Sequence, residues 1–304
     1  MQGLIIENIS NLYKIKAKKG IYEANARGKF KKEEITPVVG DKVEIQILDK
    51  ENKKAVIEEI QDRTTYIKRP KMSNITQLVL VVSSKNPKPD LLLLDKQLAF
   101  AEFLGIKAII VLNKTDLDKK KEFEKIIEVY QNIGYTVIET IAKDLEDIPE
   151  KSKKHSIGIH NLEKYLKENI NAFSGNSGVG KSTLINAIFK DTMAQEGEIS
   201  QRNKKGKNTT TSTKLYEIDE NTYIADTPGF STFDISEIEY RELDKYFKEF
   251  KPLLENCEFV GCTHIKEENC GIKQALQQGK IDSGRYERFC KIYEELKEKD
   301  KYKY

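Results

Sequence analysis

The 304-residue sequence predicts a multidomain fold built of three successive parts. Short segments of alternating apolar and polar residues fill positions 1–70, which is typical of a small N-terminal β-barrel. Strand-like and helix-like segments alternate over residues 71–231, as they do in a parallel α/β domain. Residues 232–304 are charged and helical in pattern and contain all four cysteines, which indicates a C-terminal α-helical domain that binds a metal.

The first part contains five segments that alternate in polarity and end at Gly, Asn or Asp turns. They are residues 4–9, 12–17, 21–26, 43–47 and 55–60. Five short strands in a module with basic clusters at 14–19 and 27–32 favour a barrel of the OB-fold type that binds RNA. A β-sandwich or an SH3-like barrel with no nucleic-acid role is the alternative that this pattern leaves open.

The second part alternates strands with helices that have capping residues at their ends. We expect strands at 78–83, 108–112, 135–139, 170–174, 215–218 and 222–225. Asp90 is expected to cap a helix that ends at Gly105, and Asp118 a helix that ends at Gly134. The sequence also predicts helices at 162–168 and 181–189, a polar loop at 191–213 and a frayed tail at 297–304.

Charge and hydropathy limit the classes of partner. Charged residues make up 33% of the chain, but the net charge is only +3, which does not by itself indicate a nucleic-acid partner. The apolar runs at 78–82 and 108–112 are far too short to span a bilayer, and the N-terminus lacks the pattern of a signal peptide. We therefore expect a cytoplasmic protein without a membrane partner.

A phosphate-binding loop follows the strand expected at 170–174. Its GxxxxGK[ST] pattern is formed, with one further residue, by Gly175, Asn176, Ser177, Gly178, Val179, Gly180, Lys181, Ser182 and Thr183. Glycines let the backbone N–H groups turn toward phosphate oxygens, and the helix that begins here adds the positive end of its dipole. Lys181 is expected to reach the β- and γ-phosphates, and Ser182 is expected to bind Mg²⁺.

The motif NKxD, which reads guanine in GTPases, is formed by Asn113, Lys114, Thr115 and Asp116 at the end of another expected strand. Asp116 is expected to accept two hydrogen bonds from the guanine edge that adenine cannot supply. A backbone amide near Ala142, in a weaker fifth motif, would face the guanine carbonyl. In an ordinary GTPase the phosphate-binding loop precedes NKxD, whereas here it follows, so the sequence predicts a circularly permuted GTPase.

Two further segments are expected to complete the site for GTP and Mg²⁺. Asp226 belongs to an Asp-Thr-Pro-Gly motif after a strand, so it would hold the Mg²⁺ shell through water. The amide of Gly229 in the same motif would face the γ-phosphate. A run of three threonines ends at Thr211, in the segment that supplies a hydroxyl to Mg²⁺ in the GTP state. We favour Thr211 for this role, with Thr210 second.

A second chemical cluster consists of Cys257, Cys262, His264 and Cys270. Three thiolates and one imidazole are the ligand set of a closed tetrahedral zinc site, so we expect one structural zinc per chain. The spacing departs from CxxC, and scattered buried cysteines are the alternative interpretation. Cys290 lies outside the cluster and is expected in the core.

Together these motifs resemble the ribosome small-subunit-dependent GTPase family, known as RsgA, YjeQ or YloQ. The resemblance covers nearly the whole chain, from the expected OB fold through GNSGVGKS and DTPGF to the Cys-Cys-His-Cys cluster. It implies a GTPase that hydrolyses GTP to GDP and phosphate and acts as a late assembly factor of the small ribosomal subunit. It also implies that this subunit, with its rRNA, stimulates hydrolysis, and we expect a monomer.

The chain departs from the family pattern at one position. Asn208 stands where the family usually has a histidine proposed to position or activate the attacking water, and an amide cannot take a proton at neutral pH. Phe230 stands where many GTPases carry a glutamine that orients this water, so we expect slow intrinsic hydrolysis.

Two rival hypotheses belong to other functional classes. A P-loop ATPase or kinase is disfavoured by the NKxD motif that ends at Asp116. A nucleic-acid-binding module with a vestigial nucleotide site is disfavoured by the complete motif set, although Asn208 keeps this rival open.

Overall fold

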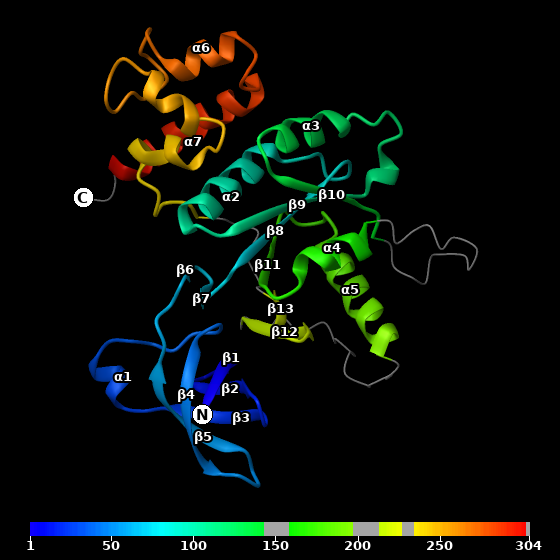
Figure 1. Cartoon of the computed structure of the whole chain (residues 1–304), viewed down its shortest axis with the longest axis vertical. Helices are drawn as coiled ribbons and strands as arrows, with labels where there is room; N and C mark the ends of the chain where they lie inside the picture. Colours follow the sequence, from blue (N-terminus) through cyan, green and yellow to red (C-terminus); the bar gives the residue numbers. More distant parts are fainter. Residues whose placement is uncertain (143–157, 197–212, 227–233, 302–304) are drawn as a thin grey trace. The chain divides into compact units, whose positions relative to one another are not determined.

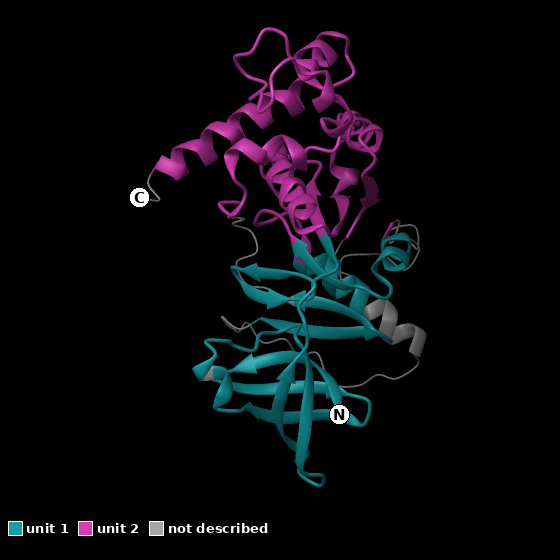
Figure 2. Ribbon diagram, turned by 60° about the vertical axis from the view of Figure 1, so that its left-hand side comes forward, with its two compact units in different colours: residues 1–78, 159–173, 182–230 teal, residues 79–158, 174–181, 231–304 magenta. Residues whose placement is uncertain are grey.

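A computed structural model describes residues 1–142, 158–196, 213–226 and 234–301, and the chain divides into two compact units. The first unit contains residues 1–78, 159–173 and 182–230, and the second contains residues 79–158, 174–181 and 231–304 (Figure 2). The division passes through the α/β part of the chain, so each unit holds a portion of it.

The first unit begins with a five-stranded β-barrel (Figure 1). Its strands are β1 (Gln2–Ile9), β2 (Leu12–Ala17), β3 (Gly20–Ala26), β4 (Lys42–Asp49) and β5 (Lys54–Ile60), with the one-turn helix α1 (Lys29–Lys32) before β4. The strands pair in the order β1-β2-β3-β5-β4, and β4 pairs again with β1, which closes the barrel. Alternate residues point inward, among them the buried Ile5, Ile15 and Ile57. The predicted N-terminal barrel is therefore confirmed, and its closure excludes an open sandwich.

The strands of the α/β part follow the barrel and a short hairpin of β6 (Tyr66–Lys68) and β7 (Lys71–Ser73). Six strands make the α/β part: β8 (Gln77–Ser83), β9 (Lys107–Asn113), β10 (Thr136–Thr140), β11 (Ile170–Ser174), β12 (Lys214–Asp219) and β13 (Thr222–Asp226). In the second unit β9 and β10 run parallel, with Asn113 opposite Thr140. In the first unit β11 and β13 run parallel, with Ala172 opposite Ala225. Ligands of parallel sheets bind beyond the carboxyl ends of the strands, where the predicted motifs lie.

Among the described residues, the α-helices of this α/β part are α2 (Leu91–Leu104), α3 (Glu124–Asn132), α4 (Ile159–Leu166) and α5 (Lys181–Glu196). Asp90 caps α2 by accepting a 3.0 Å hydrogen bond from the Leu93 backbone, and Gly105 ends the helix at φ +66°. Helix α5 continues to Glu196, so residues 191–196 are helical although we expected a loop. No helix in the described ranges is long and apolar enough to cross a bilayer.

Two helix boundaries differ from the prediction. Asp118 does not begin α3, because its carboxylate accepts a hydrogen bond from the Phe123 backbone and Lys121 has φ +55°. This positive φ interrupts a helix, so α3 starts six residues later, at Glu124. Helix α4 begins at Ile159 rather than at residue 162, and it ends at Leu166, shortly before Glu168 with φ +57°.

The C-terminal part is helical, as predicted, and belongs to the second unit. It contains 3₁₀ segments at Tyr240–Tyr246 and Lys251–Asn256, followed by α6 (Gly271–Gln277) and α7 (Ser283–Lys301). The rings of Phe247, Phe250 and Phe289 form its small core, with centroids 4.8–5.3 Å apart. The expected frayed tail is wrong over residues 297–301, which lie in α7. Buried Leu296 and the basic last turn favour this longer helix.

A buried ionic network joins α7 to α2 within the second unit. The fully buried Asp95 accepts hydrogen bonds from Arg285 (2.6 Å), from Tyr130 (2.6 Å) and from Arg288. Arg285 also binds Glu249 at 2.7 and 3.0 Å. Burial and the neighbouring Asp95 raise the pKa of the Tyr130 hydroxyl, which therefore stays a donor. The network fixes the last helix against the helix that lies next to the phosphate-binding loop.

Removing one member of this network should loosen α7. Arg285→Leu leaves buried carboxylates with too few partners, so we expect it to destabilise the docking of α7 by about 3 kcal/mol. Urea-dependent hydrogen exchange of the α7 amides measures this change. Lys121→Leu breaks the exposed pair with Glu124 and serves as control, with no measurable change expected. Equal protection of α7 in the two variants would contradict the assigned role.

Candidate functional site

The phosphate-binding loop is a tight turn between β11 and α5. Gly175 has φ +144°, and a Cβ there would lie 2.1 Å from the carbonyl oxygen of Val81. Gly180 has φ +96°, and a Cβ there would lie 2.4 Å from the side-chain Nδ2 of Asn113. Both positions therefore need glycine for backbone conformation and for space. The loop therefore packs closely against Val81 of β8 and against Asn113, which ends β9 and begins the NKxD motif.

Lys181 begins α5, and its side chain folds over the loop. Its Nζ donates hydrogen bonds to the carbonyl oxygens of Gly175 (2.5 Å) and Asn176 (2.8 Å). Burial lowers the pKa of Lys181. The cation is thus held at the inner side of the turn, where it can meet an anionic ligand that the loop encloses.

Helix α2 supports the same loop from its N-terminal half. The Asp90 carboxylate that caps α2 also accepts a 2.8 Å hydrogen bond from Asn176. About two turns further along the helix, Gln97 donates to the hydroxyl of Ser174 at 2.8 Å. The capping role of Asp90 was predictable from its position, whereas its bond to Asn176 spans 86 residues and has no local signal.

Asn113 joins three segments of the candidate site. Its side chain is fully buried at the end of β9, and its Nδ2 donates to the carbonyl oxygen of Val179 at 3.0 Å. Its Oδ1 accepts from the hydroxyl of Thr140 at 3.0 Å and from the backbone N–H of Ala142 at 3.1 Å. One amide side chain therefore positions the phosphate-binding loop and the fifth motif relative to NKxD.

Lys114 makes a second connection between the NKxD motif and the phosphate-binding loop. Its Nζ donates to the carbonyl oxygens of Gly178 (2.6 Å) and Asn86 (2.7 Å). Its backbone has φ +62°, and its carbonyl oxygen accepts a 2.6 Å hydrogen bond from Ser84. Sequence reasoning found Lys114 but missed Ser84 and Asn86, because the segment that holds them matches no nucleotide-binding motif.

The other predicted residues lie in several places. Thr115 and Asp116 form a 3₁₀ turn directly after Lys114, with Asp116 exposed. Ser177 is exposed at the crest of the loop, and Ser182 and Thr183 lie in the first turn of α5. Asp226 is the last residue of β13. The predictions for Asn208, Thr210, Thr211, Gly229, Phe230 and the basic residues 202–207 lie outside the described residues.

The described residues thus form a glycine-rich turn that holds the Lys181 amine. A buried hydrogen bond from Asn113 to Val179 and an exposed one from Lys114 to Gly178 join this turn to the NKxD motif. Backbone N–H groups and a lysine at a helix N-terminus favour a phosphorylated ligand. The Asp116 carboxylate, which ends the NKxD motif, favours a base with adjacent N–H donors. These features define a P-loop nucleotide-binding protein of the GTPase class whose motifs appear in permuted order.

Three sulfur atoms and one imidazole nitrogen converge in the C-terminal part. The ligand atoms of Cys257, Cys262, His264 and Cys270 all lie within 4.8 Å of one another. His264 Nδ1 is 3.2 Å from the Cys270 sulfur and 3.6 Å from the Cys257 sulfur. A tetrahedral zinc with bonds of about 2.0–2.3 Å would separate its ligand atoms by roughly 3.5–3.8 Å. The four side chains therefore fit one tetrahedral metal ion.

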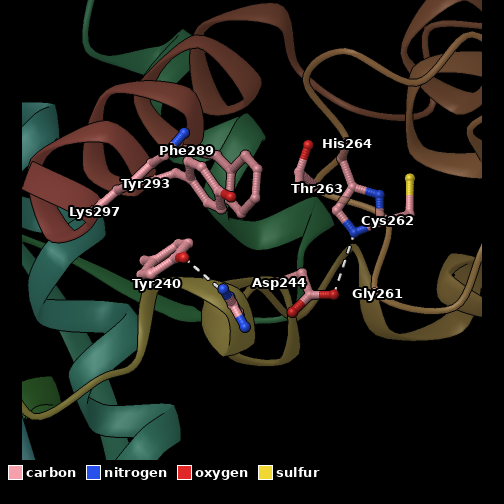
Figure 3. Close-up of a pocket in the computed structure, with 10 residues that line it drawn as sticks. Tyr240, Asp244, Gly261, Cys262, Thr263, His264, Phe289, Tyr293 and Lys297 are labelled. Carbon is pink, nitrogen blue, oxygen red and sulfur yellow. Dashed lines mark hydrogen bonds and ion pairs between the residues drawn. The ribbon is translucent and has the colours of Figure 1, made fainter. Parts of the chain in front are cut away.

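His264 is oriented by a residue that sequence reasoning missed. Its Nε2 lies 3.2 Å from the Asp244 carboxylate, so Nδ1 faces the sulfur atoms (Figure 3). Such a carboxylate commonly fixes the ring of a metal-binding histidine. Asp244 precedes His264 by 20 residues, and only the fold of the C-terminal part brings them together. The two also line a pocket of about 290 Å³ that contains Tyr240 and Tyr293.

Glu267 holds the segment between the ligands. Its carboxylate accepts hydrogen bonds from the backbone N–H (3.0 Å) and hydroxyl (2.9 Å) of Thr263. Partial burial alone would raise the pKa of Glu267, but these hydrogen bonds outweigh it and lower the pKa to about 2. The loop around His264 is thus fixed by an ionised carboxylate at neutral pH.

Comparison with protein families gives two matches along the chain. Residues 60–236 match the family described as RsgA GTPase, and residues 2–57 match the RsgA N-terminal domain. The chain belongs to the RsgA GTPase family and is a GTPase. The resemblance predicted from the motifs is confirmed.

Full-length relatives agree with this assignment. The chain is 37% identical over 301 residues to the small ribosomal subunit biogenesis GTPase RsgA of Alkaliphilus metalliredigens, and 99% of each chain is covered. It is similar to the crystal structure of YjeQ from Thermotoga maritima, with TM-score 0.81, 33% identity and coverage of 97% and 98%. It is also similar to YloQ, described as a circularly permuted GTPase, with TM-score 0.78, 31% identity and coverage of 98% and 95%. The predicted permuted GTPase fold is confirmed.

The geometry at Gly180 leads to a direct test of loop packing. Gly180→Ala would push a methyl group against Asn113, so we expect GDP affinity to fall at least tenfold, or about 1.4 kcal/mol. Gly279→Ala is the matched control, because Gly279 also has positive φ, at +71°, but lies in the C-terminal part with open space around it. Fluorescent-nucleotide titration measures both variants. Equal affinities would show that the close approach does not matter.

Proposed function

We propose that this protein hydrolyses GTP as a late assembly factor of the small ribosomal subunit, and that this subunit stimulates the hydrolysis. The observation that supports it most is the full-length similarity to GTPases named for small-subunit biogenesis. The Asn113 and Lys114 contacts with the phosphate-binding loop add support, because they join the two nucleotide-binding motifs. A subunit-stimulated GTPase needs both motifs in one site.

We assign the nucleotide-binding roles as follows. The backbone of residues 175–183 and the Lys181 amine would hold the phosphates. Ser182, Thr211 and Asp226 would hold Mg²⁺, and the Gly229 amide would face the γ-phosphate. Asp116 would read the guanine edge, and a backbone amide near Ala142 would face the guanine carbonyl. The N–H of Ala142 itself donates to Asn113, so this bond supports the role only by positioning the segment.

We also propose one structural zinc bound by the Cys257, Cys262, His264 and Cys270 cluster. The donor set and its convergence support a closed site without an open position. The metal would cross-link two loops whose own core consists of a few phenylalanines. Its chemistry would be structural, and GTP hydrolysis would not involve it.

The domain assignment stays a proposal: an OB-type RNA-binding domain at 1–70, the GTPase domain at 71–231 and the zinc-binding domain at 232–304. Exposed lysines on the barrel, among them Lys18, Lys19 and Lys29, support contact with rRNA phosphates. We propose a cytoplasmic monomer, in keeping with an assembly factor that meets the ribosomal subunit in solution.

Guanine specificity is expected to depend on Asp116. Asp116→Asn replaces an acceptor by an amide, so the ring N–H of guanine loses its partner while the oxygen of xanthine gains one. GTP affinity should fall at least tenfold and affinity for xanthosine triphosphate should rise. Competition titrations with both nucleotides measure the exchange. If the unsubstituted protein bound ATP as tightly as GTP, the ATPase or kinase hypothesis would replace ours.

The zinc assignment predicts about one zinc per chain by elemental analysis. Cys262→Ser should lower the zinc content and loosen the C-terminal part, while GDP affinity stays within threefold. Cys290→Ser is the matched control, since Cys290 lies outside the cluster. The zinc content of this variant should equal that of the unsubstituted protein. Unchanged zinc content in single variants of all four ligands would refute the site.

Hydrolysis is expected to be slow in the free protein and faster with purified small subunits. Asn208 cannot act as a base and Phe230 cannot orient water, so the attacking water needs an ordered loop. Arg202, Lys204, Lys205 and Lys207 could provide that order by binding rRNA phosphates. Neutralising these four residues should reduce stimulation much more than GTP binding.

Steady-state phosphate release with and without small subunits measures the effect, and added salt should weaken it. The four-residue variant without subunits is the control, because its basal rate should equal that of the unsubstituted protein. A free protein that already turns over as fast as the subunit-bound one would disprove stimulation. Absence of turnover in both conditions would favour the vestigial-site hypothesis.

A further inference from the structure

A β-bulge in β1 turns the side chain of Glu7 out of the barrel. The pairing of β1 with β2 shifts by one residue after Ile5, and Ile6 is the extra residue. Plain alternation would place Glu7 on the inner face with Ile5, whereas the bulge places it on the outer face, opposite Lys14. Glu7 is nevertheless only 7% exposed, so a neighbouring element covers it.

The neighbouring element is β12, which lies in the same compact unit as the barrel. The two strands run antiparallel, and Glu7 lies opposite Lys214, the first residue of β12. One oxygen of the Glu7 carboxylate lies 3.2 Å from the Lys214 Nζ, and the other lies 2.8 Å from the Lys14 Nζ. Burial alone would raise the pKa of Glu7, but the hydrogen bonds and charges of the two lysines outweigh it and lower the pKa. Glu7 is therefore ionised at neutral pH and holds both cations.

Lys214 is also a neighbour of Asp226, the residue that we assign to Mg²⁺. Strand β12 pairs with β13 as well as with β1, and in this second pairing Lys214 lies opposite Asp226. Strand β13 runs parallel to β11, which leads into the phosphate-binding loop, so its last residue, Asp226, lies at the edge of the sheet where phosphates would bind. Carboxylate oxygens are hard ligands that suit Mg²⁺ at such an edge.

This register sets two cations in competition. Residues directly opposite one another on antiparallel strands lie on the same face, with Cβ atoms about 4.5–5.5 Å apart, where a lysine can pair with an aspartate. The Lys214 ammonium binds Glu7 and lies 5.0 Å from the centre of the Tyr216 ring. We propose that Glu7 is a positioning residue for GTP hydrolysis: by binding Lys214 it keeps this cation from the Asp226 carboxylate, which then remains open to Mg²⁺. This inference rests on the proposed function, which gives Asp226 its role toward Mg²⁺.

Titration of Mg²⁺ into the complex with a fluorescent, non-hydrolysable GTP analogue tests this role apart from turnover. Glu7→Gln releases Lys214, so the Mg²⁺ concentration for half-saturation should rise about fivefold. Adding Lys214→Met removes the competing cation, so the double variant should return to within about twofold of the unsubstituted protein. A structural disturbance of the barrel would persist in the double variant, whereas competition by Lys214 would be relieved.

Lys16→Met is the matched control, because Lys16 forms a second ion pair between the barrel and β12, with Glu217 at 2.5 Å. Glu217 lies opposite Tyr223 rather than Asp226, so this variant should shift the Mg²⁺ requirement by less than about twofold. A Glu7→Gln variant that needs no more Mg²⁺ than Lys16→Met, or a double variant as impaired as Glu7→Gln, would overturn the inference and leave the proposed function standing. Binding and hydrolysis of GTP without any need for Mg²⁺ in the unsubstituted protein would overturn both.

Discussion

The buried side-chain amide of Asn113 is the contact on which the nucleotide site depends. It reaches Val179 in the phosphate-binding loop with its donor, and Thr140 and Ala142 in the fifth motif with its acceptor. Because Asn113, Thr140 and Val179 are buried, losing one partner leaves polar groups there without a hydrogen bond. The same contact explains why residue 180 is a glycine, since a Cβ there would collide with the side-chain amide of Asn113. The motifs lie at the carboxyl ends of parallel strands, which share one edge of the sheet. The contacts of Asn113 can therefore form although the order of the motifs along the chain is permuted.

Helix α2 links this site to the C-terminal part inside one compact unit. Its cap, Asp90, holds Asn176 of the phosphate-binding loop, while Asp95 on the same helix holds Arg285 of α7. The buried ionic network is costly to break, so α7 and α2 should move together. A partner bound by the C-terminal part would therefore act on a body that includes the phosphate-binding loop. This connection would give a physical basis for the proposed stimulation by a bound subunit.

Local chemistry explains which features could be predicted from sequence. The glycines of the phosphate-binding loop, Asn113 and the cysteine cluster are readable because their spacing alone reflects their role. Asp244 and the Asp95–Arg285 pair are not, since their partners are 20 and 190 residues away. The start of α3 was wrong because Asp118 satisfies a turn instead of a helix end. The helical residues 297–301 were missed because the packing of Leu296, which helps to extend α7, cannot be read from a charged sequence.

The affinity of an Asn113→Ala variant for GDP tests the central role of this amide most directly. Losing its donor and acceptor should cost about 3 kcal/mol, or roughly a hundredfold in affinity. Asn171→Ala is the matched control, since Asn171 is also fully buried and bonded to Leu166 and Tyr223, outside the motifs. It should lose stability but keep its GDP affinity within threefold. An Asn113 variant that bound GDP as tightly as the Asn171 variant would contradict the account.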